Sequence, residues 1–137
     1  VIGLEDQPGV AFKLFDHLAR HNINVDIILQ SVGRGGTKDI SFTVAKDDLA
    51  EAVATIERHR ATSLRCEKVD TEENVAKVSI VGAGMMSNPG VAAKMFEALY
   101  DAGINIKMIS TSEIRVTVLI DAQHTEKAVN AVHNKFF

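Results

Sequence analysis

Apolar residues recur along this chain with two spacings, and the same succession of spacings occurs twice. A helical stripe at positions i, i+3, i+4 and i+7 predicts a helix with one buried face. The first stripe consists of Ala11, Leu14, Phe15 and Leu18, and the second of Ala92, Met95, Phe96 and Leu99. A further helix is predicted in each half by the stripes Leu49, Ala52, Val53, Ile56 and Thr125, Ala128, Val129, Val132.

Strict alternation of apolar and polar residues predicts strands with one buried face between these helices. The alternating apolar positions are Ile23, Val25, Ile27, Leu29 and Ile40, Phe42, Val44 in the first half, and Ile104, Ile106, Met108 and Ile114, Val116, Val118, Ile120 in the second. Short apolar stretches at Val1–Leu4 and Ala76–Val81 predict a strand before each first helix. Ser63–Val69 predicts a fourth strand in the first half.

The two halves are copies of one unit. With a shift of 81 positions, residues 8–11 (Pro-Gly-Val-Ala) match residues 89–92, and 23–25 match 104–106. The shift falls to 74 beyond the glycine-rich loop 33–36, so that loop carries seven extra residues in the first copy. The order β-α-β-β-α-β is that of the ferredoxin-like unit, an α+β fold with an antiparallel sheet and both helices on one face. We expect domains at 1–70 and 71–137, with the final strand of the second missing or exchanged.

The helix ends carry local signals. Pro8 and Pro89 suit the first helical turn, where a proline forfeits no hydrogen bond. Asp6 and Ser87 lie two residues earlier, as capping residues would. Asn22 and Gly103 suit the C-termini of the same helices.

Composition narrows the class of protein. The 137 residues are 46% hydrophobic and 24% charged, with a net charge of −3, which indicates a globular chain and argues against a nucleic-acid or membrane protein. Cys66 is the single cysteine, which suits a reducing cytoplasm. Because the sequence begins inside an apolar stretch at Val1, without Met, we expect a piece of a longer polypeptide.

Signatures of enzymes and cofactors are absent from the sequence. No phosphate-binding G-x-x-x-x-G-K-[ST] loop occurs, and Ser87 stands where a dinucleotide motif beginning at Gly82 requires glycine. His17 and His21 have a spacing that could hold a metal, but no third ligand is evident, and His59 is expected to be solvated. We therefore expect no catalytic residue, no metal and no cofactor.

The loop before the first helix is the best candidate for a binding site. Residues 6–11 combine an acid, a glycine and a helix N-terminus, whose free N–H groups attract a carboxylate. Asp6 could take an ammonium group, and the two together describe an α-amino acid. The alternative is an ordinary helix cap and turn. The loop 87–92 keeps the anion-binding end but lacks the acid.

Four longer phrases resemble a known family. They are residues 6–9 (DQPG), 24–30 (NVDIILQ), 77–85 (KVSIVGAGM) and 109–115 (ISTSEIR). Together they resemble the C-terminal regulatory part of bacterial aspartate kinase, which is built of two ACT domains. The resemblance covers nearly the whole chain and includes no residue of the kinase nucleotide site.

The resemblance implies feedback inhibition by threonine, lysine or both, acting on a kinase catalytic domain or subunit. It also implies an effector site between ACT domains, formed by Asp6, Gly9, Val10, Ala11, Gln30, Asn105, Ile106 and Ser112. Gln30 would reach the effector side chain, while Asn105 and Ile106 would offer main-chain groups. Sheets with incomplete edges further predict a homodimer. The alternatives are a stand-alone amino-acid sensor, a dimerisation domain, or a small enzyme on this fold.

Overall fold

The computed structural model describes residues 1–33, 35–82 and 89–137, which form two compact units, Val1–Thr71 and Glu72–Phe137. The first unit contains β1 (Leu4–Glu5), α1 (Val10–Arg20), β2 (Val25–Val32), β3 (Thr37–Val44) and α2 (Leu49–His59). The second contains β4 (Val75–Val81), α3 (Val91–Asp101), β5 (Met108–Thr111), β6 (Arg115–Asp121) and α4 (Thr125–Phe136). Short 3-10 turns, Lys46–Asp48 and Ala122–His124, lead into α2 and α4.

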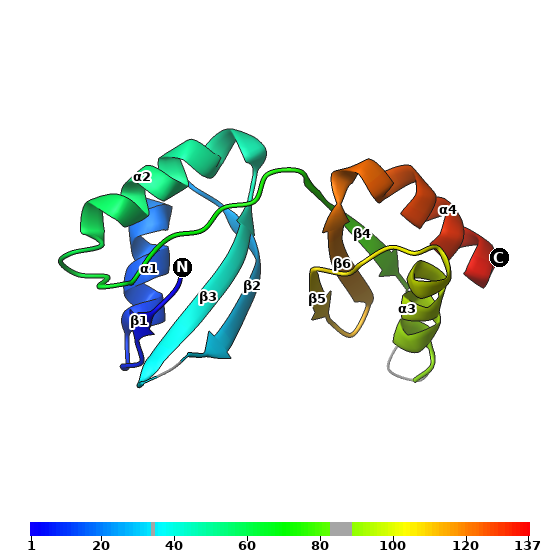
Figure 1. Cartoon of the computed structure of the whole chain (residues 1–137), viewed down its shortest axis with the longest axis horizontal. Coiled ribbons are helices and arrows are strands. Elements are labelled where there is room, and N and C mark those ends of the chain that lie inside the picture. The colour runs from blue at the N-terminus through cyan, green and yellow to red at the C-terminus, as the bar shows by residue number, and fades with distance from the viewer. Residues whose placement is uncertain (34, 83–88) are drawn as a thin grey trace. The chain divides into compact units, whose positions relative to one another are not determined.

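Each unit has an antiparallel sheet with the same topology. The strand orders are β1-β3-β2 and β4-β6-β5, so the last described strand of each unit lies in the middle. Both helices of a unit lie on one side of its sheet (Figure 1). This arrangement confirms the tandem ferredoxin-like α+β fold predicted from the repeat.

The helix-facing side of each sheet forms the core. In the first unit Leu4 and Ile40 from the strands pack with Leu14 and Leu18 of α1 and Ile56 of α2. The second core is arranged in the same way, with Val116, Val118 and Ile120 of β6 against α3 and α4. The residues of the predicted helical stripes are therefore buried or half-buried as expected, with one exception. Val129 is 48% exposed, because α4 contacts the sheet through Ala128 and Val132.

The C-termini of α1 and α3 are closed by the residues that the sequence indicated. Asn22 and Gly103 have φ angles of 58° and 72°, in the left-handed region. In α1 the N–H of Asn22 donates to Ala19 O and the N–H of Ile23 to Leu18 O, at 3.0 and 3.1 Å. Gly103 and Ile104 repeat this pattern, which is that of the Schellman motif.

The N-termini differ from the sequence prediction. The caps are Gly9 and Gly90, one residue after each proline, so Pro8 and Pro89 lie in the preceding turns and not in the helices. Asp6 makes no capping hydrogen bond, since it lies three residues before Gly9. The other predicted cap, Ser87, lies outside the described residues, as do residues 83–86 and 88.

The predicted fourth strand of the first unit is wrong, and the predicted first strand is shorter than expected. Within Ser63–Val69 only Lys68 forms a bridge, to Ile2. Arg65 has a φ of 42° and Gly3 a φ of 76°, so neither segment stays extended long enough to pair. Gly3 also tolerates no side chain, because its Cβ would lie 2.7 Å from that of Glu67. Leu64 nevertheless joins the core at 1% exposure.

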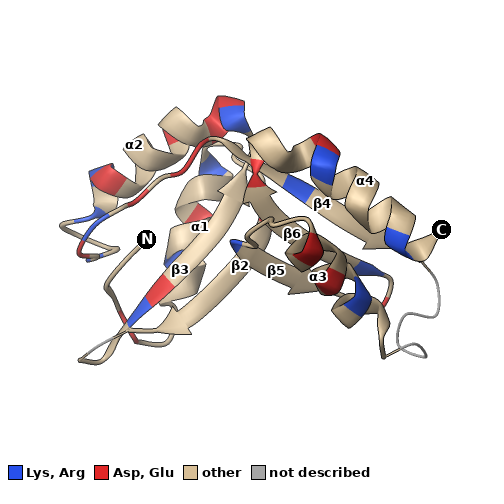
Figure 2. Ribbon diagram, turned by 45° about the vertical axis from the view of Figure 1, so that its right-hand side comes forward, with Lys and Arg blue, Asp and Glu red and all other residues tan. Residues whose placement is uncertain are grey.

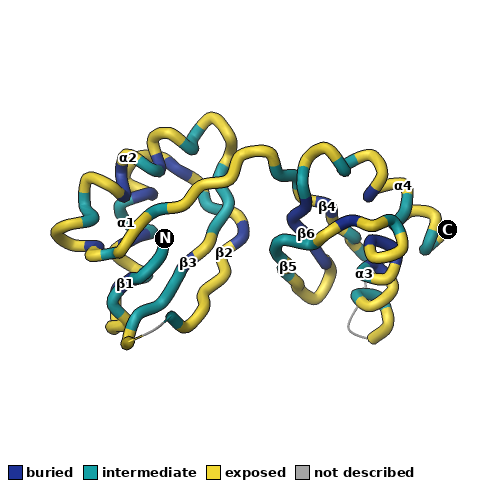
Figure 3. Tube along the Cα trace, viewed as in Figure 1, coloured by how far each residue is buried: buried dark blue, intermediate teal, exposed yellow. Residues whose placement is uncertain are grey.

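Strand β2 does not have the single buried face that its alternation predicts. Ile27 is buried, but Ile28, Leu29 and Val32 are 49%, 37% and 89% exposed, and most of the strand is exposed along its length (Figure 3). A register shift between Val25 and Ile28 interrupts the alternation, and β2 lies at the edge of its sheet.

None of the described helices and strands is strongly basic. Acidic and basic residues are interspersed along the helices of both units (Figure 2). None of the described helices is long and apolar enough to span a membrane.

Candidate functional site

The N-terminus of α1 is an open group of backbone donors. Gly9 caps the helix with φ 89° and ψ −6° and supplies no side chain. The N–H of Val10 donates to Gln7 O at 3.3 Å, whereas the N–H groups of Ala11 and Phe12 have no acceptor among the described residues. A Cβ at Gly9 would meet nothing within 4 Å, so space is free beside these donors. A carboxylate is the group that such an end attracts.

A charged pair lies where β1 leads into this loop. Asp6 Oδ1 is 3.6 Å from Lys38 Nζ, and the two side chains are 54% and 13% exposed. The N–H of Asp6 donates to Gly36 O at 2.9 Å, which holds the start of the loop against the β2–β3 turn. Lys38 was missed by sequence reasoning. Its strand position gave no signal, because only pairing with Leu4 brings it to this place.

Gln30 lies on the same side of the sheet as Lys38. Leu4 and Val32 both pair with Lys38, and Gln30 pairs with Ile40, two residues further along β3. Paired residues of antiparallel strands point to the same face, and Ile40 and Leu4 point into the core beneath the helices. Gln30 therefore points to the helix side, near the end of the sheet where α1 begins. Asp6, Gly9, Val10 and Ala11 thus lie together at the start of α1, whereas Gln30 lies on the same face of the sheet but on β2, which β3 separates from β1.

The three predicted residues of the second unit are not brought together. Asn105 and Ile106 precede β5, and Ser112 follows it, so they lie at opposite ends of that strand. Asn105 is exposed, while Ile106 packs partly against the core of its unit. The N–H of Ser112 donates to Arg115 O at 2.8 Å in the β5–β6 turn. By the repeat, Ser112 corresponds to Ser31 and Asn105 to Asn24.

His17 and His21 contact different partners and do not converge. The His17 ring stacks on that of His59, with centroids 3.7 Å apart, and its Nε2 is 3.0 Å from Ser63 Oγ. His21 Nδ1 is 3.2 Å from Glu51 Oε1. His59 is thus half-buried against α1, contrary to the expectation that it would be solvated. Across residues 1–33, 35–82 and 89–137 no three His, Cys, Asp or Glu side chains gather as a metal site would require.

The environment of His17 and Cys66 shifts both groups toward their neutral forms. Desolvation, and next the neighbouring His59, lowers the pKa of His17. Burial raises the pKa of the Cys66 thiol, which packs against the core of the first unit. A thiol kept protonated is a poor nucleophile, which agrees with the packing of Cys66 against the core of the first unit.

Comparison with known proteins gives consistent matches. The ACT domain model matches residues 1–59 and 78–136. The aspartokinase of Helicobacter pylori is 47% identical over 131 residues, which are 96% of this chain and 32% of that protein. The chain therefore spans about a third of the length of this relative.

Solved structures resemble the chain over almost its whole length. The ligand-free regulatory subunit of aspartate kinase from Thermus thermophilus has a TM-score of 0.90 at 45% identity, covering 99% of this chain and 89% of that one. A structure of aspartokinase alpha and beta subunits has a TM-score of 0.90 at 43% identity, covering 99% and 88%. Aspartokinase III of E. coli, in complex with lysine and aspartate, has a TM-score of 0.70 at 25% identity, covering 98% and 30%.

Proposed function

The chain belongs to the ACT-domain family, among the regulatory parts of aspartokinases, and we propose that it is an allosteric module that binds an amino-acid effector. The effector is threonine, lysine or both, and the domains are residues 1–70 and 71–137. Binding would inhibit an attached or associated aspartate kinase catalytic domain in the cytoplasm. A coupling free energy of about 1–3 kcal/mol is typical of such control.

The observation that carries this proposal is the open N-terminus of α1 beside the pair Asp6 and Lys38. A free amino acid is a zwitterion, and each of its charges has a complementary group here. The effector carboxylate would accept from the N–H groups of Ala11 and Phe12, next to the glycine that leaves space for it. The ammonium would bind Asp6, whose carboxylate is half exposed.

Lys38 gives this site a property that a lone acid lacks. In the free protein its ammonium, 3.6 Å away, balances the charge of Asp6. A zwitterion adds no net charge, so its ammonium can share Asp6 while its carboxylate lies near Lys38 and the helix end. The site therefore favours a molecule that carries both charges over a simple anion or a simple amine.

The choice of effector would be made by Gln30. Its side chain lies on the edge strand, on the side of the sheet where α1 begins, and its amide can donate to a hydroxyl or accept from an ammonium. Lysine as an effector is supported by the E. coli aspartokinase III complex with lysine and aspartate. Threonine is implied by the sequence phrases alone. The resemblance also assigns Asn105, Ile106 and Ser112 of the second domain to effector binding, with Asn105 and Ile106 before β5 and Ser112 after it.

We propose a homodimer as the functional assembly, in contact with a kinase catalytic subunit or domain. Strands β2 and β5 lie at the edges of their sheets, and edge strands pair readily with another chain. The solved aspartokinase with alpha and beta subunits supports a catalytic partner. A mass near that of one chain by light scattering at high concentration would contradict the dimer.

A second candidate is a stand-alone sensor or dimerisation domain without a kinase. Calorimetric titration of the chain with each of the twenty amino acids tests the binding function. Saturable heat with threonine or lysine, and none with alanine or glutamate, is the expected result. No binding across the panel would overturn the proposal and favour the dimerisation domain.

A further inference from the structure

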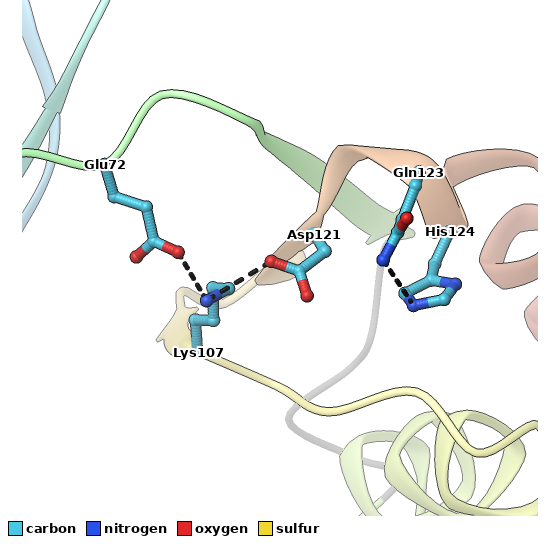
Figure 4. A network of polar contacts seen from close by, with 5 residues as sticks. All are labelled: Glu72, Lys107, Asp121, Gln123 and His124. Carbon is cyan, nitrogen blue, oxygen red and sulfur yellow. Dashed lines mark hydrogen bonds and ion pairs between the residues drawn. The ribbon is translucent and has the colours of Figure 1, made fainter.

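The ammonium group of Lys107 contacts two carboxylates, which come from different segments of the second unit. Its Nζ lies 2.5 Å from Glu72 Oε1 and 3.3 Å from Asp121 Oδ1, between them as Figure 4 shows. The Lys107 side chain is 25% exposed, against 58% for Glu72 and 43% for Asp121. The lysine is thus the most enclosed member of the cluster, and the hydrogen bonds it donates to Glu72 and then to Asp121 raise its pKa.

The cluster spans the whole width of the sheet. Asp121 ends the central strand β6, and Lys107 stands just before β5 on one side, where its N–H donates to Leu119 O at 2.8 Å. Glu72 lies just before β4 on the other side. The same end of the sheet is closed by the N–H of Ala122, which donates to Asn74 O at 2.8 Å. Residues 72–74, which lead out of the first unit, are therefore tied to the strand end beside Asn105 and Ile106.

At the position equivalent to Lys107, the first copy of the repeat has a residue of the opposite charge. Lys107 corresponds to Asp26 by the shift of 81, and Asp121 corresponds to Asp47 by the shift of 74. An ammonium between two acids at this place is consequently a feature of the second domain alone. General repeat architecture does not require it, because the first domain has the same strand order without it.

We propose that Lys107 is a positioning residue that couples the effector segment Asn105–Ile106 to the interdomain residue Glu72, an inference that rests on the proposed function. When the main-chain groups of residues 105–106 bind an effector, they also fix the position of the next residue, Lys107. A fixed ammonium then restrains Glu72, and with it the Asn74–Ala122 hydrogen bond. By linkage, a more rigid 72–74 segment in turn favours effector binding.

The amide of Ala122 reports this coupling, because it is protected by the bond to Asn74. We would measure its hydrogen exchange by NMR in the whole chain, with and without saturating threonine plus lysine. The Ile104 amide, bonded to Leu99 O, is the internal reference. Glu72→Gln removes the negative charge that pairs with Lys107, Lys107→Met removes the ammonium itself, and Lys127→Met, on the exposed side of α4, is the matched control.

Effectors should slow Ala122 exchange severalfold in the wild type and in Lys127→Met. Glu72→Gln should still bind the effectors, at most severalfold more weakly because the linkage is reciprocal, and should lose this slowing. Retention of the full slowing in Glu72→Gln overturns the proposal. If the wild type binds neither amino acid, the proposed function fails by itself. The role of the cluster is then tested without ligand. The Ala122 amide should exchange severalfold faster in Lys107→Met than in Lys127→Met, and equal rates overturn the role of the cluster.

Discussion

Asp6 Oδ1 lies 3.6 Å from Lys38 Nζ at the end of the first sheet where α1 begins. The pairing of Leu4 with Lys38 across β1 and β3 places the lysine there. Asp6, which the sequence suggested as a helix cap, is thus one partner of an ion pair. The N-terminus of α1 beside it has no side-chain cap. The proposed effector site rests on this relationship, since it provides one group for each charge of an amino acid.

Replacing Asp6 should weaken effector binding strongly. Asp6→Ala removes the partner of the ligand ammonium and leaves Lys38 without its counter-charge. Loss of one partner of a buried charge pair costs about 2–5 kcal/mol, and we expect the lower end because Asp6 is half exposed before binding. Calorimetric titration with threonine and with lysine measures the loss. The repeat supplies the control, Ser87→Ala, and equal small effects at both positions would refute the assigned role.

Gln30 should report on the identity of the effector more than on amino-acid binding in general. A site built to hydrogen-bond a hydroxyl loses most when its own polar group is removed or left unpaired. Gln30→Ala should therefore weaken threonine by about 1–3 kcal/mol and 2-aminobutyrate, which lacks the hydroxyl, by much less. Paired titrations of wild type and variant with both ligands test this. The same loss for both ligands would reduce Gln30 to a residue that only shapes the pocket.

The two capping glycines should respond differently to alanine. Gly9 has a φ of 89°, which costs an L-residue about 1–2 kcal/mol, whereas Gly90 has a φ of −85°, which alanine adopts freely. No atom of the described residues lies within 4 Å of a Cβ built at either glycine, so the difference is decided by backbone conformation. Urea unfolding should show Gly9→Ala destabilised and Gly90→Ala unchanged or slightly stabilised. Equal stability of the two variants would contradict the left-handed cap at Gly9.

Acid should weaken the packing of α1 against α2. His17 has a pKa below its ordinary value in the folded chain, from desolvation and the stacked His59, while Asp16 opposes the shift and Arg20 and His21 add to it. The unfolded chain then binds more protons near pH 6.5, so this contribution to stability is complete above that pH and is lost as the pH falls through the folded pKa. The free energy of unfolding should fall between pH 7 and pH 5.

His17→Gln is the variant that isolates this effect, with His124→Gln as the control outside the stacked pair. The fall in stability toward pH 5 should be smaller in His17→Gln and unchanged in His124→Gln. A pH dependence that is the same in all three chains would show that the stacked imidazoles do not set it.

The helices and their C-termini could be predicted from the sequence because their determinants are local. The stripe through Leu14 and Leu18 and the left-handed residues Asn22 and Gly103 act within a turn or two of chain. The repeat predicted the same order of elements in both copies, and the two units do share one sheet topology. The loop before α1 was singled out as a candidate in the same way, from a glycine and an acid next to a helix start.

The remaining features depend on contacts between residues distant in sequence. The predicted strand at 63–69 fails because Arg65 and Gly3 both take positive φ angles where the two segments meet. Lys38 reaches Asp6 only through strand pairing, and Lys107 reaches Glu72 across 35 residues. No periodicity in the sequence carries such information. Residues chosen by resemblance alone, such as Asn105 and Ser112, are accordingly separated along β5 within the second unit.

The binding of an amino acid at the N-terminus of α1 is tested most directly by amide NMR of the whole chain during titration with threonine and, separately, with lysine. At least one of the two should shift the amide signals of Ala11 and Phe12, whose N–H groups have no acceptor among the described residues, in a saturable manner and more than those of the equivalent Ala92 and Ala93. Unchanged Ala11 and Phe12 signals at saturating concentrations of both amino acids would contradict the site.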